Sequence, residues 1–250
     1  MKRVAAVLLV AAAVVGCGGS SDSGGRPAIV VSAASSLRNA LADYGGTFTP
    51  AKVRLAFGGS DELAAQIRAG ARPDVFAAAN TKLPDALFAE GRVDKPVAIT
   101  ANKLVLAVPK DSKIHSVNDL TRPGVAVAIG AESVPIGSYT RQVIGGLPSL
   151  ERNEILANVK TKEPDVAGIV GKLAQGAAGA GFVYATDVVA TKGALRAIAL
   201  PSTLQPTVVY EAAVVKGAKH PKQAREFLTG LRSGEGQSAL RQAGFLPPPK

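Results

Sequence analysis

Serine- and glycine-rich turns carry the most distinctive chemistry of this 250-residue chain. Ser35 and Ser36 follow a β-branched run, and Ser60 follows the pair Gly58-Gly59. Each turn precedes a segment with helical periodicity, so free backbone N–H groups and the positive end of a helix dipole lie beside the hydroxyls. Glycine also lets the backbone approach a ligand closely. These turns predict an anion site, although a serine at a helix start is also an ordinary N-cap.

A third turn, at 134–137 (VPIG), offers backbone N–H groups at another helix entrance, and Tyr184 ends a predicted strand. Taken locally, the two features also fit a plain loop and a half-buried core tyrosine. A fully deprotonated tetrahedral dianion has acceptors only, so neutral donors suit it, whereas a protonated phosphate also needs an acceptor. Asp61 and Glu62 would repel an anion beside Ser60, so we expect both carboxylates to point into solvent.

Short β-branched runs alternate with helix-length amphipathic segments, a pattern typical of α/β proteins with mainly parallel sheets. The predicted strands cover 28–32, 53–57, 74–78, 103–108, 125–129, 181–184 and 207–215. The predicted helices cover 37–44, 62–69, 83–90, 138–145, 165–175, 221–232 and 237–242. The connectors 92–101 and 200–206 carry no helical pattern, and we expect the chain to cross there between two lobes. A ligand cleft between lobes follows, with a single doubly wound sheet as the alternative.

The N-terminus predicts export. Lys2 and Arg3 precede an apolar run over 4–15 that is too short to span a bilayer and is typical of a secretory signal. The run ends at Cys17, the only cysteine, in a context that resembles the lipobox of bacterial lipoproteins. We expect a signal peptide over 1–16, then a lipidated Cys17 and a flexible Gly/Ser linker over 17–27. A plain secretory signal is the alternative.

Enzymatic chemistry has little support in the sequence. The only histidines, His115 and His220, lie in polar stretches without a surrounding motif, and no hydrolase or metallopeptidase motif occurs. Iron capture would need clustered tyrosines, histidines or carboxylates, and of the four tyrosines only Tyr139 and Tyr184 fall in cleft-like segments. The formal net charge of +10 comes from scattered residues. We therefore expect a binding protein with no cofactor and no nucleic-acid partner.

Longer stretches resemble the molybdate-binding proteins of bacterial ABC transporters, which have the two-lobed type II periplasmic-binding-protein fold. The stretches are VSAASSLRNAL, AFGGSDELAAQIRAGARPDVFAAAN, NKLVLAVP, VAIGAESVPIGSYTRQVI, EPDVAGIVGKLAQGAAGAGFVYATD and FLTGLRSGEGQSALRQAGF. The resemblance implies an α/β fold in which each lobe is a mainly parallel sheet flanked by helices. It also implies a first lobe of 28–102 plus 208–250 and a second lobe of 103–207.

The same resemblance implies a set of uncharged donors for the oxyanion. Hydroxyls come from Ser36, Ser60 and Tyr184, and backbone N–H groups come from Ser35, Ile136 and Val166. This chain departs modestly from the family pattern. Ser35 replaces a common alanine, Gly58-Gly59 replaces an Ala-Ser-like pair, and Ile136 is bulky where the family often has alanine.

Together these features predict a monomeric lipoprotein on the outer face of the cytoplasmic membrane. It would capture molybdate, and also tungstate, and deliver the anion to the permease of an ABC importer. Binding of another tetrahedral oxyanion such as sulfate is the main alternative. A purely structural surface lipoprotein, which would bind no oxyanion, is a further one.

Overall fold

The computed structural model describes residues 26–249. The predicted signal peptide, Cys17 and the linker up to residue 25 lie outside the described residues. Within the described range, no helix is both long enough and apolar enough to cross a membrane.

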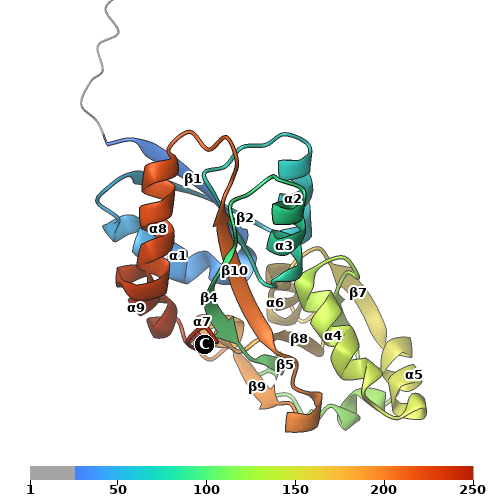
Figure 1. Cartoon of the computed structure of the whole chain (residues 1–250). Helices are drawn as coiled ribbons and strands as arrows, with labels where there is room; N and C mark the ends of the chain where they lie inside the picture. The colour runs from blue at the N-terminus through green and yellow to red at the C-terminus, as the bar shows by residue number, and fades with distance from the viewer. Residues whose placement is uncertain (1–25, 250) are drawn as a thin grey trace, which may run out of the picture.

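Two five-stranded sheets form the framework, one in the upper and one in the lower part of Figure 1. The first sheet contains β1 (Ala28–Ala34), β2 (Lys52–Gly58), β3 (Val75–Ala78), β4 (Val97–Asn102) and β10 (Val208–Val214), in the order β2-β1-β3-β10-β4. The second sheet contains β5 (Leu104–Pro109), β6 (Val127–Gly130), β7 (Val159–Glu163), β8 (Ala180–Tyr184) and β9 (Leu195–Ala199), in the order β7-β6-β8-β5-β9.

The two sheets share one pattern of strand directions. In the first, β1 pairs in parallel with β2 and β3, while β10 runs antiparallel to β3 and β4. In the second, β6 pairs in parallel with β7 and β8, while β5 runs antiparallel to β8 and β9. Each sheet thus has a single reversed strand. The predicted architecture of two mainly parallel sheets is confirmed, and the alternative of a single doubly wound sheet is wrong.

The chain crosses between the sheets twice. The first crossing is the step from β4 to β5 through Lys103, and the second is the segment 200–207, which includes the short 3-10 helix η3 (Ser202–Leu204). The prediction that the chain crosses between lobes over 92–101 is therefore mostly wrong. The second half of this segment forms β4 of the first sheet, and the crossing comes after it. Val97 and Ala98 pair there with β10, and Ala101 also pairs with Leu246 near the C-terminus.

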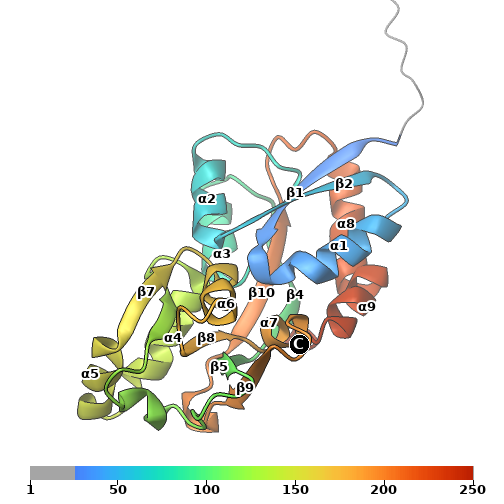
Figure 2. The same ribbon diagram turned by 180° about the vertical axis from the view of Figure 1, so that it is seen from behind.

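Helices cover both faces of the first sheet (Figures 1 and 2). Because strand side chains alternate between faces, Val75 and Ala77 share one apolar cluster with α1 (Arg38–Thr47) and α8 (Pro221–Ser233). Phe76 and Ala78 share another with α2 (Ser60–Arg68) and α3 (Lys82–Ala89). The remaining helix of this half, α9 (Glu235–Gln242), packs against α1 and α8.

The second sheet carries α4 (Pro135–Gly145), α6 (Val166–Ala174) and α7 (Ala185–Ala190), with α5 (Ser149–Ala157) packed on the 3-10 helix η2 (Asn118–Thr121). Three of these helices follow a parallel strand either directly or after a short turn: α4 follows β6, α6 follows β7 and α7 follows β8. In the first sheet, the 3-10 helix η1 (Ser35–Leu37) follows β1 and α2 follows β2. The helix entrances of both sheets therefore lie at the carboxyl ends of the parallel strands, where ligands of α/β proteins bind.

Candidate functional site

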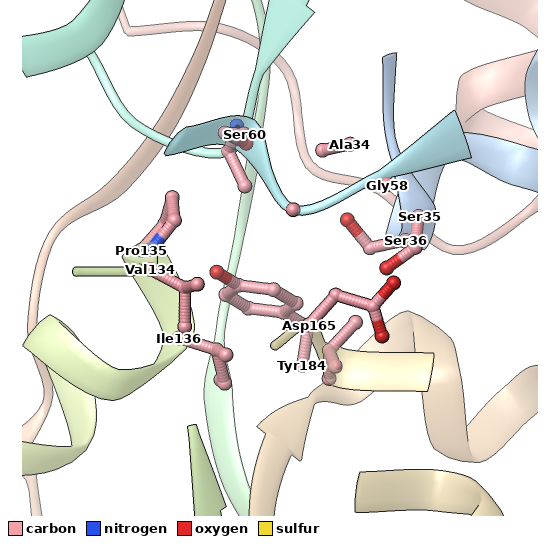
Figure 3. Close-up of a pocket in the computed structure, with 13 residues that line it drawn as sticks. Ala34, Ser35, Ser36, Gly58, Ser60, Val134, Pro135, Ile136, Asp165 and Tyr184 are labelled. Carbon is pink, nitrogen blue, oxygen red and sulfur yellow. Dashed lines mark hydrogen bonds between the residues drawn. The ribbon is translucent and has the colours of Figure 1, made fainter. Parts of the chain in front are cut away.

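A small pocket, with a cavity volume of about 20 Å³, lies between the carboxyl ends of the parallel strands of the two sheets (Figure 3). The first sheet contributes residues 34–36, 58–60 and 79, and the second contributes 134–136, 165, 166 and 184. Pockets for drug-sized ligands have roughly 300–1,000 Å³, so this pocket suits a small ion. The structure brings together all six residues that the sequence assigned to oxyanion binding: Ser35, Ser36, Ser60, Ile136, Val166 and Tyr184.

Ser60 holds a hydroxyl with a fixed orientation. It is the first residue of α2, is 2 % exposed and makes no capping hydrogen bond to its own helix, so its interpretation as an ordinary N-cap is wrong. Its Oγ instead accepts a hydrogen bond from the backbone N–H of Ala79 at 3.1 Å. Because that contact uses the oxygen as acceptor, the hydroxyl proton is available for a ligand.

Ser36 lies in η1, and its Oγ is 3.0 Å from the hydroxyl of Tyr210 on β10. Tyr210 is fully buried and belongs to an aromatic row with Tyr139, Tyr184 and Phe245, whose successive ring centroids are 6.4, 5.7 and 5.4 Å apart. Sequence reasoning missed Tyr210, because it placed only Tyr139 and Tyr184 near the cleft. The contact joins residues 174 positions apart, so no local pattern could have indicated it.

Backbone donors come from the helix entrances of the second sheet. Pro135 occupies the first turn of α4, where its missing N–H is of no consequence, and Ile136 follows it. At α6 the side chain of Asp165 accepts the N–H of Gly168 at 2.9 Å. The cap does not involve Val166, the first residue of the helix, whose N–H has no intrahelical acceptor. Both entrances therefore offer N–H groups and the positive end of a helix dipole to the pocket.

Tyr184 ends β8 and is 1 % exposed. Its hydroxyl is a buried polar atom without a hydrogen-bond partner in the described part of the chain, and in Figure 3 it points into the space beside Ser60 and the turn at Val134. Burial, then the neighbouring Tyr210, Tyr139 and Asp187, raise the pKa of Tyr184 well above its usual range. The group is therefore a neutral donor, and its missing partner indicates a ligand site.

One charged side chain, that of Asp165, lines the pocket. The six residues that the sequence assigned to oxyanion binding include no carboxylate, and the cap on Gly168 gives the Asp165 carboxylate a structural role. The expectation that Asp61 and Glu62 point into solvent is correct for Glu62, which is exposed. It is wrong for Asp61, which is half-buried and has an Oδ1 atom without a partner among residues 26–249.

Gly59 lies where the two sides of the pocket approach each other closely. A Cβ atom at this position would lie 2.5 Å from the carbonyl oxygen of Pro164, which belongs to the β7–α6 turn of the other sheet. The backbone of Gly59 has φ −63° and ψ 134°, which any residue adopts. The glycine is therefore required by the contact across the pocket and not by its own conformation.

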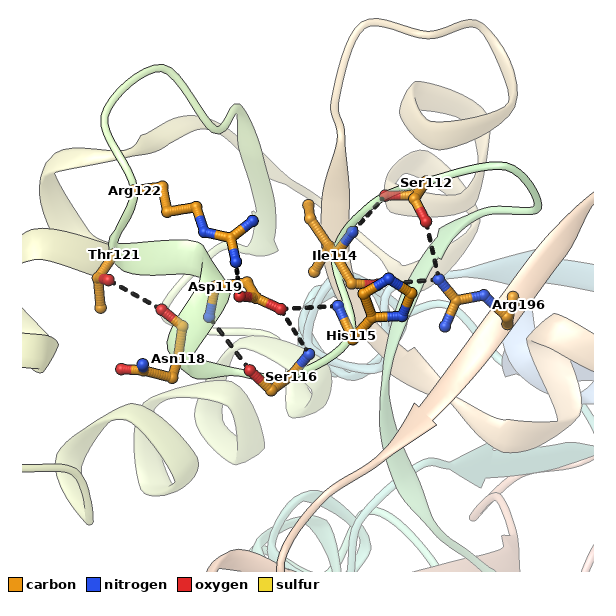
Figure 4. Close-up of polar contacts among 9 residues, drawn as sticks. All are labelled: Ser112, Ile114, His115, Ser116, Asn118, Asp119, Thr121, Arg122 and Arg196. Atoms are coloured by element: carbon orange, nitrogen blue, oxygen red, sulfur yellow. Dashed lines mark hydrogen bonds and ion pairs between the residues drawn. The ribbon is translucent and has the colours of Figure 1, made fainter.

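The two histidines lie outside the pocket. His115 is exposed and engages Asp119 through its backbone N–H at 2.7 Å, within a cluster that also contains Ser116 and Arg122 (Figure 4). The N–H donors of His115, then Ser116, outweigh burial and lower the pKa of Asp119. His220 likewise uses its backbone N–H, which donates to Asp74 at 2.7 Å. Among the described residues, no group of three histidine, cysteine or acidic side chains could hold a metal ion.

Comparisons with known proteins agree with this geometry. The family model of the bacterial extracellular solute-binding protein matches residues 29–246. The molybdate-binding protein ModA of Mycobacterium tuberculosis is 34 % identical over 228 residues, covering 88 % of this chain and 85 % of its own. A putative ABC transporter substrate-binding lipoprotein of Bacillus subtilis, YvgL, is 30 % identical over 87 % of this chain and 85 % of its own.

Among solved structures, the periplasmic molybdate-binding protein of Azotobacter vinelandii superposes with a TM-score of 0.77, over 88 % of this chain and all (100 %) of its own. At 22 % sequence identity, this likeness shows the fold alone. The matched fold agrees with the two sheets described above.

Proposed function

Since the chain belongs to the bacterial extracellular solute-binding protein family, we propose that its pocket captures molybdate. Members of this family bind solutes for ABC importers, so the chain is a solute-binding protein and not an enzyme, and its ligand is cargo and not a cofactor. The observation that carries the proposal is the Tyr184 hydroxyl, which is buried at the pocket and has no hydrogen-bond partner among the described residues.

The composition of the pocket supports a tetrahedral dianion as the ligand. Ser36, Ser60 and Tyr184 supply hydroxyls, and the entrances at Ile136 and Val166 supply backbone N–H groups. Among residues 26–249, no lysine or arginine lines the pocket. Neutral donors avoid the desolvation penalty of a buried cation, while helix dipoles still favour negative charge. Tungstate, which has the same charge and nearly the same size, is expected to bind as well.

We further propose that residues 28–102 with 208–250 form one lobe and residues 103–207 the other. The lobes would close about the two crossings, at Lys103 and at 200–207, in a hinge motion of the kind that surrounds ligands in binding proteins. The contact between Gly59 and Pro164 supports this division, because it joins the two proposed lobes at the pocket. Closure removes water and strengthens the hydrogen bonds to the anion.

The proposed protein is a monomeric lipoprotein on the outer face of the cytoplasmic membrane, anchored through Cys17, that delivers its anion to an ABC permease. Support comes from the lipobox-like sequence at Cys17 and from the lipoprotein description of the Bacillus subtilis relative. Expression in a bacterial host, followed by mass spectrometry of the N-terminal peptide, tests the anchor. An acylated N-terminal Cys17 is expected, and Cys17→Ser should release the protein from the membrane fraction.

A thermal-unfolding titration tests the ligand. A ligand at 100 times its Kd stabilises the folded state by about 2.7 kcal/mol, which raises the Tm measurably. We expect stabilisation by molybdate and tungstate at micromolar concentrations, and weaker stabilisation by sulfate and phosphate. If sulfate stabilises more than molybdate, the sulfate alternative is correct. If none of the four anions raises the Tm, the pocket does not bind an oxyanion.

A further inference from the structure

The positive charge of the chain is scattered in the sequence but gathers in the fold at one edge of the first sheet. This amino edge, where the parallel strands begin, consists of the segments 26–28, 49–52, 68–74, 90–95 and 216–222. These segments contain nine lysines and arginines and three carboxylates, whereas the rest of 26–249 contains seventeen and fifteen. The amino edge therefore carries six of the eight net positive charges of the described chain.

Every strand of the first sheet has an exposed cation at this edge. In sheet order these are Lys52 on β2, Arg26 before β1, Arg72 before β3, Lys216 after β10 and Lys95 before β4. Because adjacent strands lie about 4.8 Å apart, the five cations form a row roughly 19 Å long. The loops that follow α2 and β10, at the top of Figure 1, hold the middle of this row.

The carboxylates of the amino edge neutralise few of these cations. Asp74 is buried, and it accepts the backbone N–H groups of Val30 and His220 at 2.8 and 2.7 Å. Glu90 pairs with Arg68, and Asp94 pairs with Lys216 and Arg225. The other seven cations of the edge form no ion pair among residues 26–249: Arg26, Lys52, Arg72, Arg92, Lys95, Lys219 and Lys222.

Three cations of the amino edge surround a cavity of about 340 Å³, to which Arg72, Arg92 and Lys216 all contribute. The backbone N–H of Lys216 donates to the carbonyl oxygen of Arg92 at 2.8 Å, which holds these two residues side by side. No acidic residue of the described chain lines the cavity. Its chemistry therefore suits a phosphate group, for which arginine and lysine are the usual protein donors.

The oxyanion pocket lies at the opposite edge of the same sheet. The strands β1 and β2 have seven residues each, so they separate the two edges by about 23 Å. The potential of a charged surface decays over about 8 Å at physiological salt. An anionic surface at the amino edge would therefore not repel a dianion that enters the pocket.

The chain before Arg26 joins the fold at the amino edge. Cys17 precedes Arg26 by nine positions, and nine residues span at most about 32 Å. A lipid anchor on Cys17 would therefore keep the row of cations within reach of the bilayer.

We propose that the amino edge of the first sheet is a docking surface for the headgroups of anionic phospholipids, and that the first lobe rests on the bilayer with its oxyanion pocket away from the lipid. The placement at a membrane rests on the proposed anchor at Cys17. Exposed lysines and arginines near an anionic bilayer each strengthen binding, and salt screens the attraction. The lobe is thus able to leave the lipid for the permease while the anchor retains the protein.

Cosedimentation with lipid vesicles tests the docking surface. Residues 18–250 contain both sheets with their helices and lack both the apolar N-terminal run and Cys17, so any binding comes from the folded part. We expect binding to vesicles of phosphatidylcholine mixed with phosphatidylglycerol, no binding to phosphatidylcholine alone, and loss of binding at high salt. Equal binding to both kinds of vesicle, or binding to neither, overturns the inference.

Charge reversal tests the position of the surface. Arg72→Glu/Arg92→Glu should lower the partition onto the mixed vesicles more than about tenfold. The matched control Lys110→Glu/Lys160→Glu makes the same change in net charge at two exposed positions around the second sheet, and should lower it less than about threefold. Equal losses would show that net charge alone drives binding, which also overturns the inference. Thermal unfolding without ligand checks that both variants fold.

A fluorescent label tests the orientation of the native surface without removing any charge. Residues 18–250 contain no cysteine, so Ala71→Cys and Ser149→Cys each provide one exposed attachment site. An environment-sensitive dye at position 71 should change its emission on the mixed vesicles, and a dye at 149 should not. Equal or reversed responses would contradict the proposed orientation. A Cys17 without acyl chains in the cell would refute the anchor alone, because the vesicle assays do not use it.

Discussion

The two halves of the pocket supply different kinds of hydrogen-bond donor. The half from the first sheet supplies the hydroxyls of Ser36 and Ser60, each of which already has a partner in its own sheet. The half from the second sheet supplies helix entrances at Ile136 and Val166, together with the Tyr184 hydroxyl, which has no partner among the described residues.

This difference shows which half is complete before a ligand arrives. The serines are oriented by contacts within the protein itself, so the first half is preorganised. Tyr184 buries a hydroxyl that has no partner among the described residues, which costs about 1–3 kcal/mol, and under the proposed function an anion supplies that partner. The first half is thus expected to add to stability as well as affinity, and Tyr184 to add to affinity alone.

The largest effect is expected where the halves touch. Gly59→Ala places a Cβ 2.5 Å from the Pro164 oxygen, and overpacking of this kind costs about 1–3 kcal/mol. The molybdate affinity should fall about tenfold to a hundredfold, as measured by calorimetry. Gly58→Ala is the matched control, because its Cβ would have no neighbour closer than 3.6 Å. Equal affinities of the two variants would contradict a close approach at Gly59.

Ser60→Ala should weaken both stability and binding. It removes a donor to the ligand and leaves the buried N–H of Ala79 without its acceptor, at about 1–3 kcal/mol for the unsatisfied group. Urea unfolding without ligand and calorimetry with molybdate measure the two effects. A variant with lower affinity but unchanged stability would show that the Ser60–Ala79 contact does not preorganise the first half.

Tyr184→Phe should separate the two properties. The affinity for molybdate is expected to fall by about 1–3 kcal/mol, because the ligand loses one buried donor. The free energy of unfolding without ligand should stay unchanged or rise, since the lost hydroxyl has no partner in the protein. Loss of stability in the ligand-free variant would indicate that the hydroxyl has a partner and that the contrast between the halves is wrong.

The smallest expected effect is on the pH dependence of stability, through two carboxyl groups. Burial raises the pKa of Asp187, next to Tyr184, and of Glu211, on β10, to about 7. The folded chain keeps protons that the unfolded chain has lost above about pH 4. Stability should therefore fall as the pH rises from about 4 to about 7 and level off above that.

Urea unfolding across this pH range checks the expectation. Asp187→Asn keeps an oxygen that can accept the N–H of Tyr184, as Asp187 does at 3.0 Å, and should remove part of the pH dependence. Glu211→Gln should remove a further part. A pH profile that neither substitution alters would show that both carboxyl groups ionise normally in the folded protein.

Much of the fold could be predicted because its central strands are continuous apolar runs. The strands β1, β3, β6 and β8 are of this kind. The missed strand β7 has the sequence VKTKE and alternates between half-buried and exposed positions, so it lacks an apolar run. Likewise α7 has six residues, too few to show helical periodicity. The strand β4 lies in a segment that seemed extended, and its partner β10 is more than a hundred positions away in the chain.

The candidate site was predicted as far as local sequence and family resemblance reach. Both indicate the turns at Ser36, Ser60 and Ile136, because each turn precedes a helix. The contact of Tyr210 with Ser36 depends on how distant strands are arranged in the first sheet, which leaves no local signal. The contact of Gly59 with Pro164 has the same origin, since it depends on how the two halves meet.

The position of the reversed strand β10 in the first sheet has a consequence for folding. All five strands of the second sheet lie within the continuous segment 104–199, whereas the first sheet needs β10 to return from position 208 and insert between β3 and β4. Joining β3 to β10 closes a loop that contains the entire second sheet, and contacts of such long sequence separation form slowly. The second sheet is thus able to assemble first, and the first sheet becomes complete only after the C-terminal part of the chain has docked.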